Sequence, residues 1–165
     1  MEVIALRDIH PGEEIVQSYL DASLASTSDE RRKRIKDEWS FACTCPICAG
    51  AGVAASDDRR RQIRREQERL DAAGSDAGRV LALARGLMRL YEDEDMIVPR
   101  ADNYWLAAVV ANALELDEDS VKYAAAARRY SALVFGEESE EVRAAAEVER
   151  DPAGYRARLR AEANG

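Results

Sequence analysis

Three cysteines lie close together in the chain: Cys43, Cys45 and Cys48. The spacing C-x-C-x-x-C brings three thiolates to one point on a tight loop, and Zn²⁺ takes four such ligands in a tetrahedron. The alternative is three buried or free thiols, but thiols this close would repel one another as thiolates or oxidise. An odd number of crowded cysteines also fits metal ligands better than disulfides. The sequence therefore predicts a zinc loop that supplies three of four ligands.

The fourth ligand has one formal candidate, because His10 is the only histidine in the chain. His10 precedes Pro11 and Gly12, which form a turn signal, and a solvated polar side chain is usual there. We therefore expect the fourth ligand to come from outside this chain.

The elements around the cysteines are short. Residues 3–9 and 13–20 are rich in β-branched and large apolar side chains, and they flank the Pro11–Gly12 turn signal, so a hairpin is expected. Two strands alone are marginal in water. The segment Thr27-Ser28-Asp29-Glu30 is typical of a capping box and predicts a helix over about 28–38. The basic runs 31–34 and 59–61 are expected to be solvated helix faces paired with nearby acids.

The rest of the chain has helical periodicity. A linker at 50–52 is followed from Asp57 by about six predicted helices, with Asp102 and Asp117 as expected N-caps, Gly136 as a stop, and Asp151-Pro152 as a cap and first-turn proline. Three apolar stripes support the helices: Val80, Leu83, Leu87, Leu90 and Tyr91; Trp105, Val109, Ala113 and Leu116; Tyr123, Ala127, Tyr130 and Val134. The expected fold is mainly α: a short β-hairpin, a cysteine-rich zinc loop, and an antiparallel, tetratricopeptide-like helical bundle.

The order of these features resembles the end of a SET domain that runs into its post-SET zinc loop. The hairpin residues 5–21, the intervening helix, and Trp39-Ser40-Phe41 before the cysteines are most similar to the SET-and-MYND (SMYD-like) protein-lysine methyltransferases. The expected boundaries are 1–42 for the C-terminal part of the SET domain, 43–50 for the post-SET cysteine cluster, and 51–165 for the helical domain.

The resemblance implies a role for several residues. Tyr19 matches the family's active-site tyrosine, Phe41 an aromatic that walls the lysine channel and the S-adenosylmethionine site, and Trp39 a channel position where the family often has tyrosine. Cys43, Cys45 and Cys48 match the post-SET zinc ligands. Without the resemblance, Tyr19 is an ordinary core or rim residue, and the alternation of Trp39 and Phe41 indicates burial on one strand face.

The other half of the family pattern has no counterpart in the sequence. We find no glycine-rich segment and no Asn-His-Ser-Cys-type motif, which in the family contact the donor and supply the fourth zinc cysteine. The expected function is that of a C-terminal methyltransferase fragment that is inactive as an isolated chain. The alternative is a non-catalytic helical interaction module with a vestigial zinc loop.

The amino-acid composition limits the classes of molecule that the protein is expected to bind. The formal net charge is −8, which argues against nucleic acid and leaves room for a basic protein substrate or peptide. No segment is apolar enough for a membrane span, and the N-terminus lacks the pattern of a signal peptide. An intracellular protein of the cytoplasm or nucleus is expected.

Overall fold

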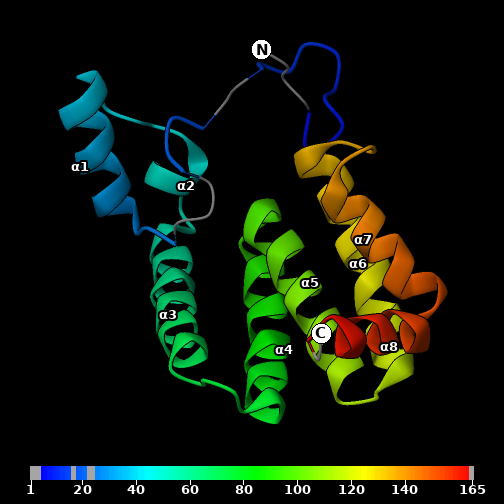
Figure 1. Ribbon diagram of the computed structural model, residues 1–165. Helices are drawn as coiled ribbons and strands as arrows, with labels where there is room; N and C mark the ends of the chain where they lie inside the picture. Colours follow the sequence, from blue (N-terminus) through cyan, green and yellow to red (C-terminus); the bar gives the residue numbers. More distant parts are fainter. Residues whose placement is uncertain (1–4, 16–17, 22–24, 164–165) are drawn as a thin grey trace.

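The computed structural model describes residues 5–15, 18–21 and 25–163. Within these ranges the chain forms eight α-helices and no strand, so the mainly α prediction is confirmed (Figure 1). In this part of the chain, no helix combines the length and the apolar character needed to cross a membrane. The helices are α1 (Ser28–Trp39), α2 (Pro46–Ala49), α3 (Val53–Asp71), α4 (Ala77–Asp93), α5 (Ile97–Ala113), α6 (Asp117–Phe135), α7 (Glu140–Arg150) and α8 (Pro152–Ala163).

The predicted hairpin is wrong in the part that is described. Residues 5–15 and 18–21 contain turns, bends and irregular backbone, whereas residues 3, 4, 16 and 17 lie outside the described residues. The turn itself forms: Gly12 has φ +85°, and the Glu13 N–H donates to the His10 carbonyl at 3.0 Å. Two strands cannot hold a sheet without a surface that covers their apolar face, so in the described residues the turn is present without the strands.

The start of α1 follows the predicted capping pattern. The Glu30 carboxylate accepts hydrogen bonds from the Thr27 backbone N–H at 2.7 Å and from the Thr27 hydroxyl at 2.9 Å. The helix ends at Trp39, because Ser40 adopts the left-handed conformation with φ 59°. The short α2 then carries the last of the three cysteines, and α3 begins after Gly52.

Helices α4 to α8 share one core. Successive helices from α3 to α7 pack side by side, and α8 lies across α5 and α6 (Figure 1). The centre of this core is rich in alanine, which allows close helix approach. Its buried members are Leu81, Ala84, Met88, Ala107, Ala108, Ala111, Tyr123, Ala124, Val148 and Tyr155.

A second, smaller cluster joins α3 to the core. Ile63 on α3 packs with Leu87 and Tyr91 on α4, together with Ala25 and Met96. The helix α4 is therefore buried on two faces, and it is the element through which the N-terminal half of the chain is tied to the C-terminal half.

The helix ends agree in part with the caps and stops predicted from the sequence. Gly136 ends α6 with φ 92°, and the Asp151 carboxylate accepts a hydrogen bond from Gly154 N–H at 2.9 Å at the start of α8. Asp117 is the first residue of α6 rather than its cap. The expectation for Asp102 is wrong, because α5 begins at Ile97 and places Asp102 inside the helix.

Candidate metal and aromatic site

The three cysteines converge as the sequence predicts. Their Sγ atoms all lie within 4.8 Å of one another. In a tetrahedral site with Zn–S bonds of about 2.3 Å, neighbouring sulfur atoms are about 3.8 Å apart. The sulfur atoms of Cys43, Cys45 and Cys48 therefore need to approach one another by about 1 Å at most to bind zinc. They fit three corners of a tetrahedral zinc site. Among the described residues, no further His, Cys, Asp or Glu joins the group.

Local backbone chemistry explains why the thiols meet. Cys45 is the N-cap of α2 and Pro46 is its first residue, the position where proline is favoured. The Cys45 carbonyl accepts hydrogen bonds from the N–H groups of Cys48 and Ala49, both at 2.9 Å. The tight turn thus folds Cys48 back toward Cys45.

The two thiols of this turn differ electrostatically. Burial alone would raise the pKa of Cys45, but hydrogen bonds from the Cys43 and Cys48 thiols and from the N–H groups of Ile47 and Cys48 outweigh it, so the pKa is lowered. Burial raises the pKa of the Cys48 thiol. Of these two thiols, the exposed Cys45 is therefore the one that the fold favours as a thiolate, which is the form that binds metal.

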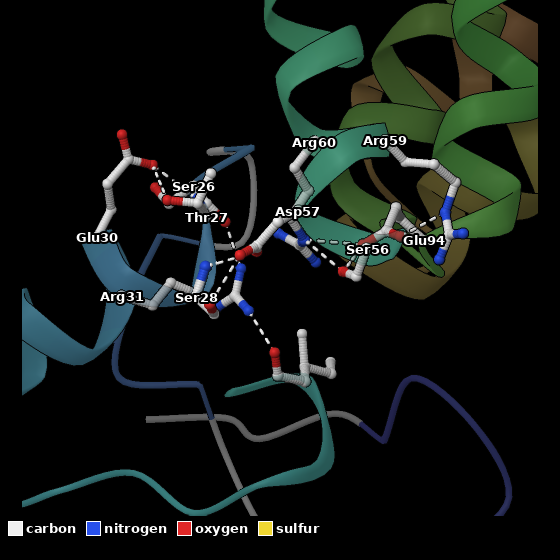
Figure 2. A network of polar contacts seen from close by, with 11 residues as sticks. Ser26, Thr27, Ser28, Glu30, Arg31, Ser56, Asp57, Arg59, Arg60 and Glu94 are labelled. Atoms are coloured by element: carbon white, nitrogen blue, oxygen red, sulfur yellow. Dashed lines mark hydrogen bonds and ion pairs between the residues drawn. The ribbon is translucent and has the colours of Figure 1, made fainter. Parts of the chain in front are cut away.

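A buried arginine lies beside the thiols. Arg31 on α1 donates to the Ile47 carbonyl at 2.6 Å and to the Ser26 carbonyl (Figure 2). Its guanidinium also favours the thiolate form of Cys48 and so opposes the effect of burial on the pKa of that thiol. The prediction that the run 31–34 is wholly a solvated face is wrong for Arg31, which is 9% exposed. This guanidinium connects α1 to the cysteine loop, and nothing in the local sequence distinguishes it from its exposed neighbours.

A carboxylate on α3 fixes the start of α1. Asp57 accepts from the Ser28 backbone N–H and from the Ser28 hydroxyl, both at 2.7 Å, and both residues are buried (Figure 2). The bonded residues are separated by 29 positions, so sequence periodicity had no means of pairing them. Asp57 thus holds the N-terminus of α1 against α3.

A second polar cluster ties α3 to the end of α4. The buried Glu94 accepts hydrogen bonds from Ser56 at 2.6 Å, from Arg59 at 2.7 Å and from Arg60 at 2.8 Å (Figure 2). The expectation of a solvated run at 59–61 holds for Arg61 and is wrong for Arg60, which is buried. The cysteine loop is therefore anchored through α3 to the helical core.

The three aromatic residues singled out in the sequence also meet. The Tyr19 ring lies edge-on to the Trp39 ring, with centroids 5.5 Å apart, and edge-on to the Phe41 ring, with centroids 5.4 Å apart. The left-handed Ser40 reverses the chain between Trp39 and Phe41, so both rings reach one tyrosine. The two aromatics do not alternate on a strand. All three rings remain exposed, and Tyr19 is 49% exposed.

His10 does not lie where it could act as a metal ligand beside the cysteines. It is exposed, its backbone N–H donates to Glu13 at 3.1 Å, and it is not in the group that the cysteines form. The arrangement therefore offers three thiol ligands and, a few residues before them in the chain, an open aromatic cluster.

Comparisons with known proteins add a separate line of evidence. No family model matches the chain. N-lysine methyltransferase SMYD2 of Sus scrofa is 43% identical over 47 residues, which are 28% of this chain and 10% of that protein. Histone-lysine N-methyltransferase SMYD3 of Homo sapiens is 48% identical over 44 residues, 27% of this chain and 10% of that protein. Protein-lysine N-trimethyltransferase SMYD5 of Mus musculus is 42% identical over 59 residues, 35% of this chain and 13% of that protein.

The matches are short but consistent with one another. A segment of this chain is similar to several SMYD methyltransferases, and the chain spans about a tenth of the length of the curated relatives it matches. With the three-cysteine group, this similarity confirms the resemblance to the SMYD-like proteins.

Proposed function

We propose that this chain forms the C-terminal end of a SET-type protein-lysine methyltransferase. Residues 1–42 are assigned to the end of the SET domain, 43–50 to the post-SET zinc loop, and 51–165 to a tetratricopeptide-like helical domain. The observation that carries the proposal is the convergence of Tyr19 with Trp39 and Phe41 directly before the cysteine group. The similarity to SMYD methyltransferases supports it.

Tyr19 has the chemistry that methyl transfer needs. In this reaction S-adenosylmethionine supplies the methyl group, and the lysine amine must be neutral and in line with it. A phenol hydroxyl held at the reacting centre orients that amine. The Tyr19 ring is supported edge-on by two aromatics, yet about half of the residue is open. We assign Phe41 to a wall of the donor site and Trp39 to a wall of the lysine channel.

The cysteines are assigned to structure rather than catalysis. Cys43, Cys45 and Cys48 would hold one zinc ion, with a fourth ligand from outside this chain. A closed thiolate shell of this kind stabilises a fold and leaves no open position for substrate. The zinc would fix the loop that follows Phe41, and with it the aromatic cluster.

The isolated chain is expected to transfer no methyl group. The aromatic cluster supplies one exposed wall of the proposed active site. The donor-binding motifs of the family have no counterpart in residues 1–165. Misplacement of reactants by about 1 Å can lower the rate on the order of 100-fold. The absence of the methyl-donor pocket should lower the rate far more.

The test is a Tyr19→Phe substitution in a chain that carries the complete SET domain. A radiolabelled methyl-transfer assay on mixed protein substrates should show reduced kcat, while calorimetry shows nearly unchanged affinity for S-adenosylmethionine, because the hydroxyl acts at the reacting centre. The matched control is Tyr155→Phe, which removes the same hydroxyl from α8. Equal activity of the Tyr19→Phe and control proteins would remove Tyr19 from catalysis. Robust transfer by residues 1–165 alone would contradict the assignment of the donor site to other segments.

A second candidate function is a helical interaction module that binds a peptide and catalyses nothing. The observation that favours it is an open groove of about 570 Å³ between α3, α4, α5 and residues 25–26. The genomic sequence upstream separates the two functions: an in-frame Asn-His-x-Cys motif supports the methyltransferase, and a start codon without such a segment supports the module.

A further inference from the structure

The groove between α3, α4, α5 and residues 25–26 lies apart from the cysteines and the aromatic cluster. Its volume is about 570 Å³, and binding sites usually enclose about 300–1,000 Å³. Apolar side chains from two helices line part of it, among them Leu70 on α3 and Pro99 and Leu106 on α5. The space therefore suits part of a peptide chain, and its polar lining indicates which kind.

Two buried polar side chains in the groove have hydrogen-bonding capacity that the protein does not use. Asn103 is 5% exposed; its Nδ2 donates to the Ala84 carbonyl at 2.8 Å, and its Oδ1 accepts from no described residue. The fully enclosed side-chain atom without a partner in the described chain is Arg100 Nε, so Asn103 Oδ1 is accessible from the groove. Tyr91 is 3% exposed; its hydroxyl accepts from Gln67 at 3.0 Å and donates to no described residue.

These two side chains are complementary to a peptide unit, which offers one N–H donor and one carbonyl acceptor. Asn103 Oδ1 can accept a backbone N–H, and the Tyr91 hydroxyl can donate to a backbone carbonyl. Both side chains are already fixed, Asn103 by its bond to α4 and Tyr91 by packing with Ile63 and Leu87. Little side-chain entropy would therefore be lost when a peptide binds.

The groove also carries unpaired negative charge. Asp71 on α3 and Asp102 on α5 line it, and neither forms an ion pair or a hydrogen bond with a described residue. After burial, which is the largest cause, these two carboxylates raise the pKa of the Tyr91 hydroxyl, so both lie near it. Among the described lining residues the only cation is Arg64, which pairs with Glu30 at 2.9 Å.

Neither carboxylate stabilises the helix that carries it. Asp71 is the last residue of α3, where the helix dipole disfavours a negative charge. Asp102 lies inside α5, and burial, followed by the nearby Glu141, raises the pKa of its carboxyl. A cation in the groove would relieve both unfavourable positions.

We propose that this groove binds an extended, basic segment of a partner protein. Asn103 and Tyr91 contact its backbone, while Asp71 and Asp102 compensate the charge of a lysine or arginine side chain. The proposal rests on the second candidate function, the peptide-binding module, and names the class of peptide; it does not depend on methyl transfer. The net charge of −8 would also attract basic segments to the molecule.

The experiment is an NMR titration of ¹⁵N-labelled residues 1–165 with capped alanine-based peptides that carry a central lysine, glutamine or glutamate. The lysine peptide should shift the side-chain amide signals of Asn103 and the backbone signals of Asp71 and Asp102. The glutamine peptide should bind more weakly, and the glutamate peptide should leave these signals in place. Asp71→Asn should weaken binding of the lysine peptide roughly 3- to 5-fold, as expected for a partly exposed ion pair.

The matched control for Asp71→Asn is Asp93→Asn, because Asp93 is also the exposed last residue of its helix and does not line the groove. Tyr91→Phe keeps the ring and should weaken binding of the lysine and glutamine peptides alike, with Tyr155→Phe as its control. Melting temperatures of all variants show whether the fold is intact.

Equal binding of the glutamate and lysine peptides in the groove would overturn the basic class and leave the peptide-binding module standing. Equal loss of affinity in Asp71→Asn and Asp93→Asn would also overturn it. Unchanged affinity in Tyr91→Phe would overturn the backbone contact. Shifts confined to other parts of the molecule, or no binding of any peptide, would overturn both this proposal and the module, whereas the methyltransferase proposal is tested separately by Tyr19→Phe.

Discussion

At the scale of single residues, Cys45 combines several stabilising contacts. It is the N-cap of α2, its carbonyl accepts two backbone N–H groups, and its sulfur receives hydrogen bonds from Ile47 and Cys48. Hydrogen bonds to the charged form favour that form. The fold therefore favours Cys45 as a thiolate, and its loss should disrupt metal binding.

We predict that Cys45→Ser abolishes zinc binding by the chain. The wild-type chain should bind zinc more weakly than a closed four-ligand site does, because only three thiolates are available. Elemental analysis of purified protein, with Thr44→Ser as the neighbouring control, measures the difference. Equal and negligible zinc in the wild-type and variant proteins would contradict a metal site in this loop.

Glu30 should give the stability of the chain a defined dependence on pH. The Thr27 backbone N–H, followed by the Arg64 guanidinium, lowers the pKa of Glu30 from 4.5 to about 2. A carboxyl whose pKa is lowered on folding stabilises the native state above its unfolded pKa, and this contribution disappears as the pH falls from 4.5 toward 2.

The measurement is urea unfolding of the wild-type and Glu30→Gln proteins between pH 3 and pH 7. The wild-type protein should be the more stable one at pH 7, and the difference should shrink as the pH falls. Glu68→Gln, an exposed change on α3, is the control. A difference that stays constant across this range would show that the Glu30 charge does not stabilise α1.

Residues differ in how far their roles could be predicted. The convergence of the cysteines follows from spacing within six positions and from Pro46, so the sequence was sufficient. Arg31 is buried because Ser26 and Ile47 offer carbonyls on either side of it. Its sequence context is a basic run, and hydrogen bonds made by a later loop decide its burial.

At the scale of elements, the Asp57 carboxylate makes the buried contact between α1 and α3. Asp57→Ala should leave the Ser28 backbone N–H and hydroxyl without their partner. A buried hydrogen-bonding group that loses its partner costs about 1–3 kcal/mol. Hydrogen exchange of α1 amides should therefore become faster, while exchange in α5 and α6 stays unchanged.

The matched control is Asp58→Ala, the adjacent exposed carboxylate, which pairs with Arg61 in the same helix. Exposed pairs of this kind contribute about 0–1 kcal/mol. Equal acceleration of α1 exchange in the two variants would show that helix propensity, rather than the contact with Ser28, holds α1 in place.

The core-facing side of α5 shows where periodicity fails. The stripe of Trp105, Val109, Ala113 and Leu116 is wrong, because Leu116 and Ala113 are exposed and the other two are half-buried. The buried side consists of small and polar residues: Pro99, Arg100, Ala101, Asn103, Ala107, Ala108, Ala111 and Asn112. Close packing against α4 and α6 selects small side chains, which a search for large apolar residues misses. On α4, Leu83, Leu87 and Tyr91 were predicted correctly as buried residues, and the large side chains of Leu87 and Tyr91 fill the contact with α3.

At the scale of the whole molecule, the helical region should fold without the N-terminal segment. Its main cluster draws only on α4 to α8, and the Glu94 cluster lies within residues 56–94. We predict that residues 51–165 alone give a helical circular-dichroism spectrum and a cooperative melt. The melting temperature should be lower than that of the full chain, since Ala25 and the Ser28–Asp57 contact are lost.

A second variant shows which contact accounts for the lower melting temperature. Introducing Asp57→Ala into the shortened chain should change its melting temperature little, because Ser28 is already absent. A disordered spectrum for residues 51–165 would instead mean that these helices need the preceding residues as a packing surface.

The position of Arg31 has a consequence for the charge balance of the cysteine loop. Three thiolates around a divalent ion carry a net charge of about −1, and a fourth thiolate makes it about −2. The cationic Arg31 guanidinium favours the thiolate form of Cys48, so its charge offsets that of the three-thiolate assembly. A neutral assembly is less nucleophilic and less attractive to electrophiles and oxidants than an anionic one. Arg31 would therefore protect the zinc-bound sulfurs from alkylation, in addition to joining two helices.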